Sequence, residues 1–428
     1  MELFESNNLL QFEIFITCII CIWGLKKINF GKTIGCTSGL LINILIFFGI
    51  GPMFYIYAKP QSEFLDKQVI LNNMLLAYPY ILIGLILSIP VFNTKNKYFI
   101  ISNFNYKSFN INWLLLILSF TSQIISNLSI AKSGIGTIFP VLTYLLYPCI
   151  VSATVIIKKT NYKSILFFCV ALLITIYIGI TSPWRSILIM IIFSFALGLY
   201  LRNKKYLKYT IIPVVIIIVI IMPYQEAKKL TEGSLKGMQT VLLANALIID
   251  NKERLLILSD FFSSRINYAR ETSYVLNGID QKLIYYSYGE SYLNIFKQLI
   301  PRFFWYNKPS FTNEYGFELP RKTGLLSSSD ENSSWGVNYI AEFSYNFNLN
   351  YLPIFIFILF FLFKYIDSLA SKFIQNEQLL FALNLSLFYL GLNLVSLLYY
   401  STYFLWIFIL IKFISLFFHE NTSLRRNR

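Results

Sequence analysis

Eleven apolar runs divide this sequence, and each approaches the length that a helix needs to cross a lipid bilayer. A helix rises about 1.5 Å per residue, so roughly 20 residues cross about 30 Å of hydrocarbon. The runs cover residues 9–25, 39–57, 69–92, 111–130, 135–157, 165–180, 186–201, 209–222, 351–363, 379–398 and 403–418. The run 351–363 is the shortest of them. Together the runs predict a bundle of membrane-spanning helices.

The balance of residue types supports this prediction. Charged residues make up 13% of the chain and hydrophobic residues 56%, whereas soluble domains carry about 25% charged residues. Because so little polar surface cannot cover a water-soluble globule, we predict an all-α polytopic membrane protein. The formal net charge of +15 does not indicate nucleic-acid binding, because the basic residues form short clusters between apolar runs.

Lys and Arg residues are distributed unevenly between alternate connections. One set of connections holds 18 of them and the other set holds 4. The rich set comprises residues 26–38, 93–110, 158–164, 202–208, 364–378 and the tail after residue 418. Cytoplasmic connections carry the excess of Lys and Arg. We therefore expect the N-terminus outside, the C-terminus in the cytoplasm, and the longest connection on the outer face.

That longest connection sets the domain organisation. We predict eight spans in residues 1–222, a large external loop in 223–350, and three spans with a cytoplasmic tail in 351–428. The loop is electrically balanced, with 13 basic and 13 acidic residues. From Arg254 onward, apolar residues recur at helical spacing, at Leu255, Leu258, Phe262, Ile266 and Ala269. This pattern predicts an amphipathic helix lying on the membrane surface.

Several cations on the predicted outer side could bind an anion. Arg185 opens the seventh run in the sequence TSPWRS, and the loop adds Arg265, Arg270, Arg302, Lys308 and Arg321. The guanidinium group of Arg presents a fork of donors that suits phosphate oxygens. Prolines beside Arg302, Lys308 and Arg321 stiffen the backbone there. Any one of these cations could equally be a solvated loop residue, and Arg185 could be an anchor at the membrane interface.

Carboxylates of the loop are the candidate general bases. They are Asp260, Asp280, Glu290, Glu314, Glu318 and Glu342. Glu342 is preferred because its segment, AEFSYNFN, stands at the mouth of the next span. Aromatic residues such as Tyr288 and Trp305 could stack on sugar rings, although a membrane-interface belt would also explain them.

The sequence lacks the usual motifs for cofactor and metal chemistry. His419 is the only histidine and stands at the predicted cytoplasmic end of the last run. The chain contains no D-x-D pair for a divalent ion and no glycine-rich nucleotide loop. We therefore predict no cofactor and no metal.

Four segments in order resemble a known family, the bacterial oligosaccharide repeat-unit polymerases of O-antigen and capsule synthesis (Wzy type). They are TSPWRSILIM, SSRINYA, IPRFFWYNKP and AEFSYNFN, spread over residues 181–350. The span layout, with one large external loop late in the chain, resembles that family over the whole length. The resemblance implies a GT-C-like glycosyltransferase in the inner membrane.

The resemblance also implies a substrate and roles for residues. The substrate would be a glycan repeat unit on undecaprenyl diphosphate, and pathway partners would include a flippase and a chain-length regulator. Arg185, Arg265 and Arg302 would stabilise the diphosphate leaving group, and Glu342 would deprotonate the acceptor hydroxyl. Lys308, Arg270, Arg321, Glu290, Tyr288 and Trp305 would contact the substrate. Alternatives are an O-antigen ligase, a lipid-linked oligosaccharide flippase and a membrane scaffold.

Overall fold

The computed structural model of the 428-residue chain consists, in its described residues, of helices joined by turns, and no strand occurs in those residues. The described residues are 2–28, 36–57, 65–93, 109–126, 146–156, 162–181, 267–293, 318–327 and 337–373, with residues 191, 194, 195, 198, 199, 202 and 305. The longer elements before residue 200 are α1 (Glu2–Lys27), α2 (Cys36–Ile44), the π-helix η1 (Leu45–Ile50), α3 (Gly51–Tyr57), α4 (Lys67–Leu87), α5 (Ile89–Asn93), α6 (Phe109–Ser126), α8 (Leu146–Ile156) and α9 (Tyr162–Thr181). The later elements are α15 (Tyr268–Asp280), α18 (Leu319–Lys322), α19 (Tyr339–Asn346), the 3-10 helix η10 (Leu349–Tyr351) and α20 (Leu352–Phe373).

Four helical stretches in the described residues are long and apolar enough to cross a membrane. They are Asn7–Lys27, Cys36–Ile56, Lys67–Asn93 and Leu349–Ser368. They correspond to the predicted runs 9–25, 39–57, 69–92 and 351–363. The chain is therefore a helical membrane protein, as its composition predicts.

The other predicted runs have different outcomes. Helices α6 and α9 form at the predicted runs 111–130 and 165–180, and α8 forms in the second part of 135–157. The runs 209–222, 379–398 and 403–418 lie outside the described residues, as does most of 186–201.

The span after the large loop is longer than its predicted length. Charged Lys364 marked the end of the predicted run, yet α20 continues through it to Phe373. Lys364 donates from Nζ to the carbonyl oxygen of Val91, and the Asp367 carboxylate also accepts hydrogen bonds within the bundle. Partners supplied by other helices allow these charged residues to continue the span.

Local sequence explains how two of these helices begin and bend. The side chain of Asp66 accepts a hydrogen bond from the amide of Gln68 and so caps the start of α4. The π-helix η1 ends at Ile50, and α3 follows at Gly51, directly before Pro52. Proline has no amide hydrogen and its ring crowds the preceding turn, so a helix commonly loses its regular pattern there.

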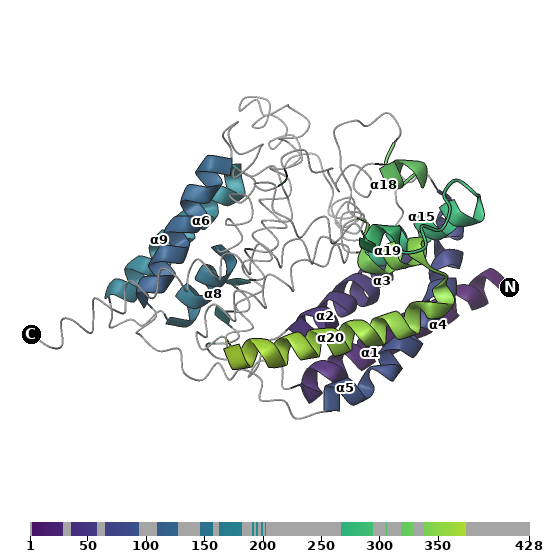
Figure 1. Ribbon diagram of the computed structural model, residues 1–428, viewed down its shortest axis with the longest axis horizontal. Helices are drawn as coiled ribbons and strands as arrows, with labels where there is room; N and C mark the ends of the chain where they lie inside the picture. Colours follow the sequence, from purple (N-terminus) through teal and green to yellow (C-terminus); the bar gives the residue numbers. More distant parts are fainter. Residues whose placement is uncertain are drawn as a thin grey trace, which may run out of the picture.

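Helices α1, α2, α4 and α20 pack side by side in one bundle, as Figure 1 shows. Gly84 of α4 lies directly against Ile356 of α20, since a Cβ atom added to Gly84 would stand 2.8 Å from the Cβ of Ile356. The rings of Phe92 and Phe360 meet edge to face, with centroids 5.0 Å apart. Small residues that permit close backbone approach are typical of helix pairs in membranes.

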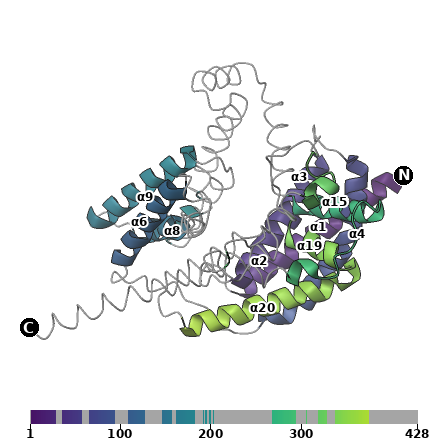
Figure 2. The ribbon, with the colours of Figure 1, turned by 45° about the horizontal axis from the view of Figure 1, so that its top comes forward.

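A second group of helices, α6, α8 and α9, is held by its own mutual contacts. Figure 2 shows this group apart from the bundle that contains α20. Trp113 of α6 meets Phe167 of α9 edge to face, with ring centroids 5.1 Å apart.

The described segments of the large loop pack at one end of the first bundle. Helix α15 contacts α3, α4 and α19, and Figures 1 and 2 both place α15 and α19 beside α3. This is the end where α3 finishes and α4 and α20 begin. The loop segments thus meet the ends of three helices that the sequence assigns to the outer face.

The prediction of one amphipathic surface helix from Arg254 is wrong in its described part. Asn267 adopts a non-helical conformation and caps a new helix, α15, through its side chain. Every residue of α15 from Ala269 to Val275 is buried against protein. Polar residues of this helix, among them Arg270 and Glu271, are buried too, and Ser273 bonds to the Ile70 carbonyl, which matches a helix enclosed by α4 and α19.

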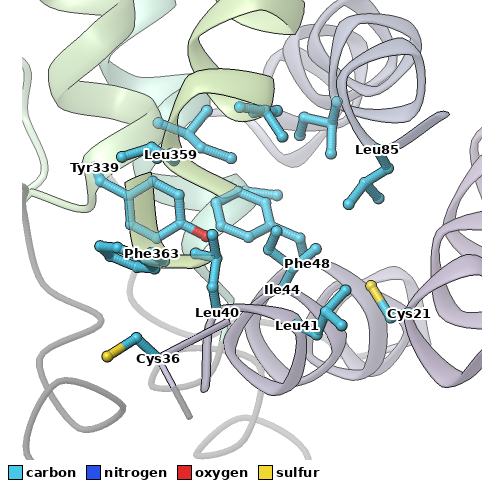
Figure 3. Packing of buried hydrophobic residues seen from close by; sticks show 14 of the residues in the cluster. Cys21, Cys36, Leu40, Leu41, Ile44, Phe48, Leu85, Tyr339, Leu359 and Phe363 are labelled. Atoms are coloured by element: carbon cyan, nitrogen blue, oxygen red, sulfur yellow. The ribbon is translucent and has the colours of Figure 1, made fainter. Parts of the chain in front are cut away.

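Helix α19 reaches into the bundle with its first residue. The Tyr339 hydroxyl donates to Oδ1 of Asn43 at 3.3 Å, well inside the candidate span Cys36–Ile56. Figure 3 shows the Tyr339 ring among Leu40, Ile44 and Phe48. One helix of the polar loop therefore contacts the apolar core of the bundle through the Tyr339 side chain.

Candidate functional site

Helix α19 places Glu342 at the centre of a buried polar network. The helix has eight residues, which is too short for stability in isolation, so its position depends on its neighbours. Glu342 is 1% exposed. A buried carboxylate is costly unless hydrogen bonds compensate the lost water. The hydrogen bonds around Glu342 therefore determine whether the site is stable.

Asn338 holds the amino end of α19. Its Oδ1 accepts hydrogen bonds from the amides of Ile340 and Ala341, each at 3.0 Å. Its Nδ2 donates to the carbonyl oxygen of Tyr268 at 2.8 Å and to Oε2 of Glu271 at 2.9 Å. The buried side chain of Asn338 thus joins the amino end of α19 to α15.

Asn346 holds the other end of the same helix. Its Nδ2 donates to Oγ of Ser291 at 2.6 Å and to the carbonyl oxygen of Glu342 at 2.8 Å. Its Oδ1 accepts from the amide of Gly289 at 3.1 Å. Asn346 therefore joins α19 to the turn that follows α15.

The Glu342 carboxylate faces a hydroxyl group. The Oγ of Ser291 donates to Oε1 of Glu342 at 3.4 Å, and both residues are buried. Glu342 lies four residues from both Asn338 and Asn346, so the three share one face of the helix. The network thus presents a carboxylate oxygen to an O–H donor, which is the contact that a general base makes with its substrate.

The turn beside this network exposes an aromatic ring. Tyr288 has a φ of 48° and Gly289 a φ of 89°, so two successive residues occupy the left-handed region. Gly289 tolerates this conformation, whereas Tyr288 does so at a cost of about 1 kcal/mol or more. Tyr288 is 82% exposed, and Glu290 is also exposed. The predicted substrate-binding residues Tyr288 and Glu290 therefore alternate along the chain with Gly289 and Ser291, which contact the network.

Two predicted substrate-binding cations lie on neighbouring helices. Arg270 is buried in α15, with its guanidinium carbon 5.3 Å from the centroid of the Tyr274 ring. Arg321 is half-buried in α18. Leu319 of α18 packs with Val275 of α15 and Ala341 of α19 in one small apolar cluster. Arg270 thus lies on α15 and Arg321 on α18, and both of these helices pack against α19.

The other predicted residues are placed as follows. Trp305 is half-buried. Arg185, Arg265, Arg302 and Lys308 lie outside the described residues. Glu318, an alternative base, forms an exposed ion pair with Lys322 at 3.3 Å, with both side chains 59% exposed. Such a pair is typical of a solvated helix surface.

Sequence reasoning did not single out Glu271, Ser291, Asn338 or Asn346. For Glu271, the signal is an acidic residue in the first turn of a helix, where a negative charge is favourable. For the asparagines, it is their preference for helix caps, since Asn338 precedes an apolar helical segment. Within the described parts of the chain, no group of three or more His, Cys, Asp or Glu side chains is placed to hold a metal ion.

The fold and the network define a helical membrane protein with a buried polar site on its loop helices. No protein-family model, curated protein sequence or solved structure matches the chain.

Proposed function

We propose that this chain is a polymerase of lipid-linked oligosaccharide repeat units. It would transfer the growing glycan from undecaprenyl diphosphate to a sugar hydroxyl of the next unit. The observation that carries the proposal is the buried Glu342–Ser291 contact, made by the same turn that exposes the ring of Tyr288. A carboxylate next to an aromatic platform is the pairing that a sugar hydroxyl acceptor needs.

Glu342 acts as the general base in this proposal. The oxygen that accepts from Ser291 would accept from the sugar hydroxyl, a donor of the same kind. The turn that carries Tyr288 and Glu290 lies against the network, so an acceptor sugar reaches Glu342 when this turn moves. The Tyr288 ring then supports one face of that sugar.

The proposed glycosyl transfer needs no oxidant or reductant. The bond between the anomeric carbon of the donor glycan and the diphosphate oxygen breaks, and a bond from that carbon to the acceptor oxygen forms. The acceptor proton passes to Glu342, and the bonding electrons leave with undecaprenyl diphosphate. Arg185, Arg265 and Arg302 supply the positive charge for this leaving group, as their order in the family-like motifs implies.

The proposed setting is the inner membrane of a bacterium, with about eleven spans of a GT-C-like enzyme and the loop on the outer face. The sequence supports this orientation through its uneven Lys and Arg distribution. The packing of α15 and α19 against the ends of α3, α4 and α20 agrees with a single-sided loop. The apolar tail of the substrate would enter between the helices, where the Tyr339 side chain of α19 contacts Asn43.

A complementation experiment tests the proposal. The gene is deleted from its own host, and surface polysaccharide and lipid-linked glycans are separated by size. We expect single repeat units in place of a long ladder, and restoration of the ladder by the wild-type chain. Glu342→Gln should fail to restore it, while Glu318→Gln, which removes an exposed carboxylate from the same loop, should restore it.

The pattern of products separates the alternatives. Full-length glycan left on its lipid carrier would indicate a ligase and overturn the proposal. Repeat units that never reach the outer face would indicate a flippase and would also overturn it. A normal ladder from Glu342→Gln would remove Glu342 from the mechanism. The same ladder from Arg265→Ala and Arg302→Ala would remove the proposed phosphate contacts.

A further inference from the structure

We infer that Glu271 is a positioning residue that fixes Glu342 through the cap of α19. This inference rests on the proposed function, because Glu342 is the proposed base. Three links connect the two residues: Glu271 to Asn338, Asn338 to the first turn of α19, and that turn to Glu342.

The first link is a buried two-point contact. Oε2 of Glu271 accepts from the main-chain nitrogen of Asn338 at 3.0 Å and from its Nδ2 at 2.9 Å. Glu271 is 4% exposed and Asn338 is fully buried. Hydrogen bonds to a charged acceptor are shorter and stronger than those between neutral groups, and burial from water strengthens them. The pair therefore holds Asn338 in one orientation.

The second link is the direction of the Asn338 amide. With Nδ2 turned toward Glu271 and the Tyr268 carbonyl, Oδ1 must face the opposite way. It meets the amides of Ile340 and Ala341, which have no partner within the helix at its first turn. Glu271 thus determines which end of the Asn338 side chain caps α19.

The third link runs along the helix backbone. The amide of Glu342 donates to the carbonyl oxygen of Asn338 at 2.8 Å, closing the first turn. Glu342 therefore stands one turn from the cap, and the Asn346 contacts with Ser291 and Gly289 hold the turn after it. Loss of the cap would leave the helix anchored at one end, and a misplacement of about 1 Å can reduce a rate roughly 100-fold.

A pair of substitutions can reverse the side-chain hydrogen bond between positions 271 and 338, so that residue 271 donates and residue 338 accepts. Glu271→Gln removes the charge, so the oxygen that remains accepts from Asn338 through weaker, neutral hydrogen bonds. Asn338→Asp keeps an oxygen for the helix cap but sets two carboxylates together. In the double variant, the amide at position 271 can donate to the carboxylate at position 338, so this side-chain hydrogen bond returns, while the bond to the Tyr268 carbonyl does not. Ser273→Ala is the matched control, because Ser273 bonds α15 to the Ile70 carbonyl of α4 and not to α19.

The four variants are purified and assayed with the lipid-linked oligosaccharide fraction extracted from host membranes. We expect each single variant of the pair to lower kcat roughly tenfold at an unchanged KM. We expect the kcat of the double variant to exceed that of Asn338→Asp by about threefold, and Ser273→Ala to keep the wild-type kcat. Wild-type kcat in Glu271→Gln, or a double variant no better than the product of its singles, would overturn the inference.

A second readout does not depend on catalysis. Hydrogen exchange at the amides of Ile340 and Ala341 reports the cap directly, and Glu271→Gln should speed exchange at both by about tenfold or more. Unchanged exchange would overturn the inference even if activity fell. If the wild-type protein forms no polymer, the proposed function fails, while this exchange measurement still decides whether Glu271 holds the cap.

Discussion

The carboxylate of Asp367 lies across the amino end of α2, with Oδ1 2.6 Å from the main-chain nitrogen of Cys36. Its Oδ2 accepts from the amide of Thr37 at 3.0 Å and from the Thr37 hydroxyl at 2.7 Å. A negative charge at a helix amino end is favourable, and here it satisfies amides that the helix itself leaves open. Asp367 therefore ties α20 to α2 over a separation of 331 residues.

Substitution of Asp367 should destabilise the bundle. Asp367→Asn removes the charge and turns a donor toward one of three donors, so we expect a loss of about 1–3 kcal/mol. Asp367→Ala should lower the apparent Tm at least as much, as measured by thermal unfolding in detergent. Tyr365→Phe, at an exposed position of the same helix, should leave the Tm unchanged. Equal Tm values for all variants would contradict the structural role of this contact.

Gly84 sets the distance between α4 and α20. A Cβ at this position would stand 2.8 Å from the Cβ of Ile356, which is too close for any real contact and involves no flexible atom. Gly84→Ala should therefore separate the helices and cost about 1–3 kcal/mol, despite the better helix propensity of alanine.

Gly24→Ala is the control for this measurement. Its new Cβ would meet the flexible end of the Leu41 side chain, at 3.1 Å, which can move aside. We expect the Tm of this variant to equal or exceed that of the wild type. A Gly84→Ala variant as stable as Gly24→Ala would show that the α4–α20 approach is looser than described.

Tyr288 offers a test that separates stability from binding. Asparagine tolerates the left-handed region better than tyrosine does, so Tyr288→Asn should leave stability unchanged or raise it by about 0.5–1 kcal/mol. If the ring supports the acceptor sugar, polymer formation by the same variant should fall roughly tenfold. Tyr288→Phe keeps the ring and should retain most of the activity.

Lys282 is the matched position, with a φ of 57° in the turn after α15. Lys282→Asn should gain stability for the same backbone reason and leave the polymer ladder unchanged. Equal ladders from Tyr288→Asn and Lys282→Asn would remove Tyr288 from the substrate site.

The predicted orientation is testable by chemical labelling in intact cells. Tyr285 is 76% exposed on the loop, and Lys27 is exposed at the end of α1 that is predicted to be cytoplasmic. A membrane-impermeant maleimide should label Tyr285→Cys without lysis and Lys27→Cys only after lysis. The parent protein gives the background from the natural thiols, of which Cys169 is exposed among the described residues. The opposite pattern would invert the orientation and remove the proposed reaction with it.

The positions of the spans could be predicted from the sequence because a helix must be long and apolar enough to cross the hydrocarbon core of the bilayer. Runs 9–25, 39–57 and 69–92 fall within two or three residues of the helical spans in the structure. The run 351–363 was too short because a lone Lys364 in sequence does not reveal the Val91 carbonyl that accepts its hydrogen bond. Charge marks a boundary only where no neighbouring helix supplies a partner.

The site was readable only in part. Glu342 was preferred for its place before a span, and the structure finds it buried and bonded to Ser291, although its chemical role is still a prediction. Asn338 and Asn346 were missed because asparagine is common in loops, and its value here comes from residues about 50 to 70 positions away. Contacts of that kind leave no periodic signal.

By itself, the sequence determined that this chain is a helical membrane protein, and it located the spans that the structure describes. Those properties follow from apolar length, which each segment carries on its own. Only the tertiary structure decided that α19 enters the bundle, that α15 is enclosed rather than on the membrane surface, and that Glu342 is held between two asparagines. Burial and hydrogen-bond partners depend on which segments meet, and distant segments meet only when the chain is folded.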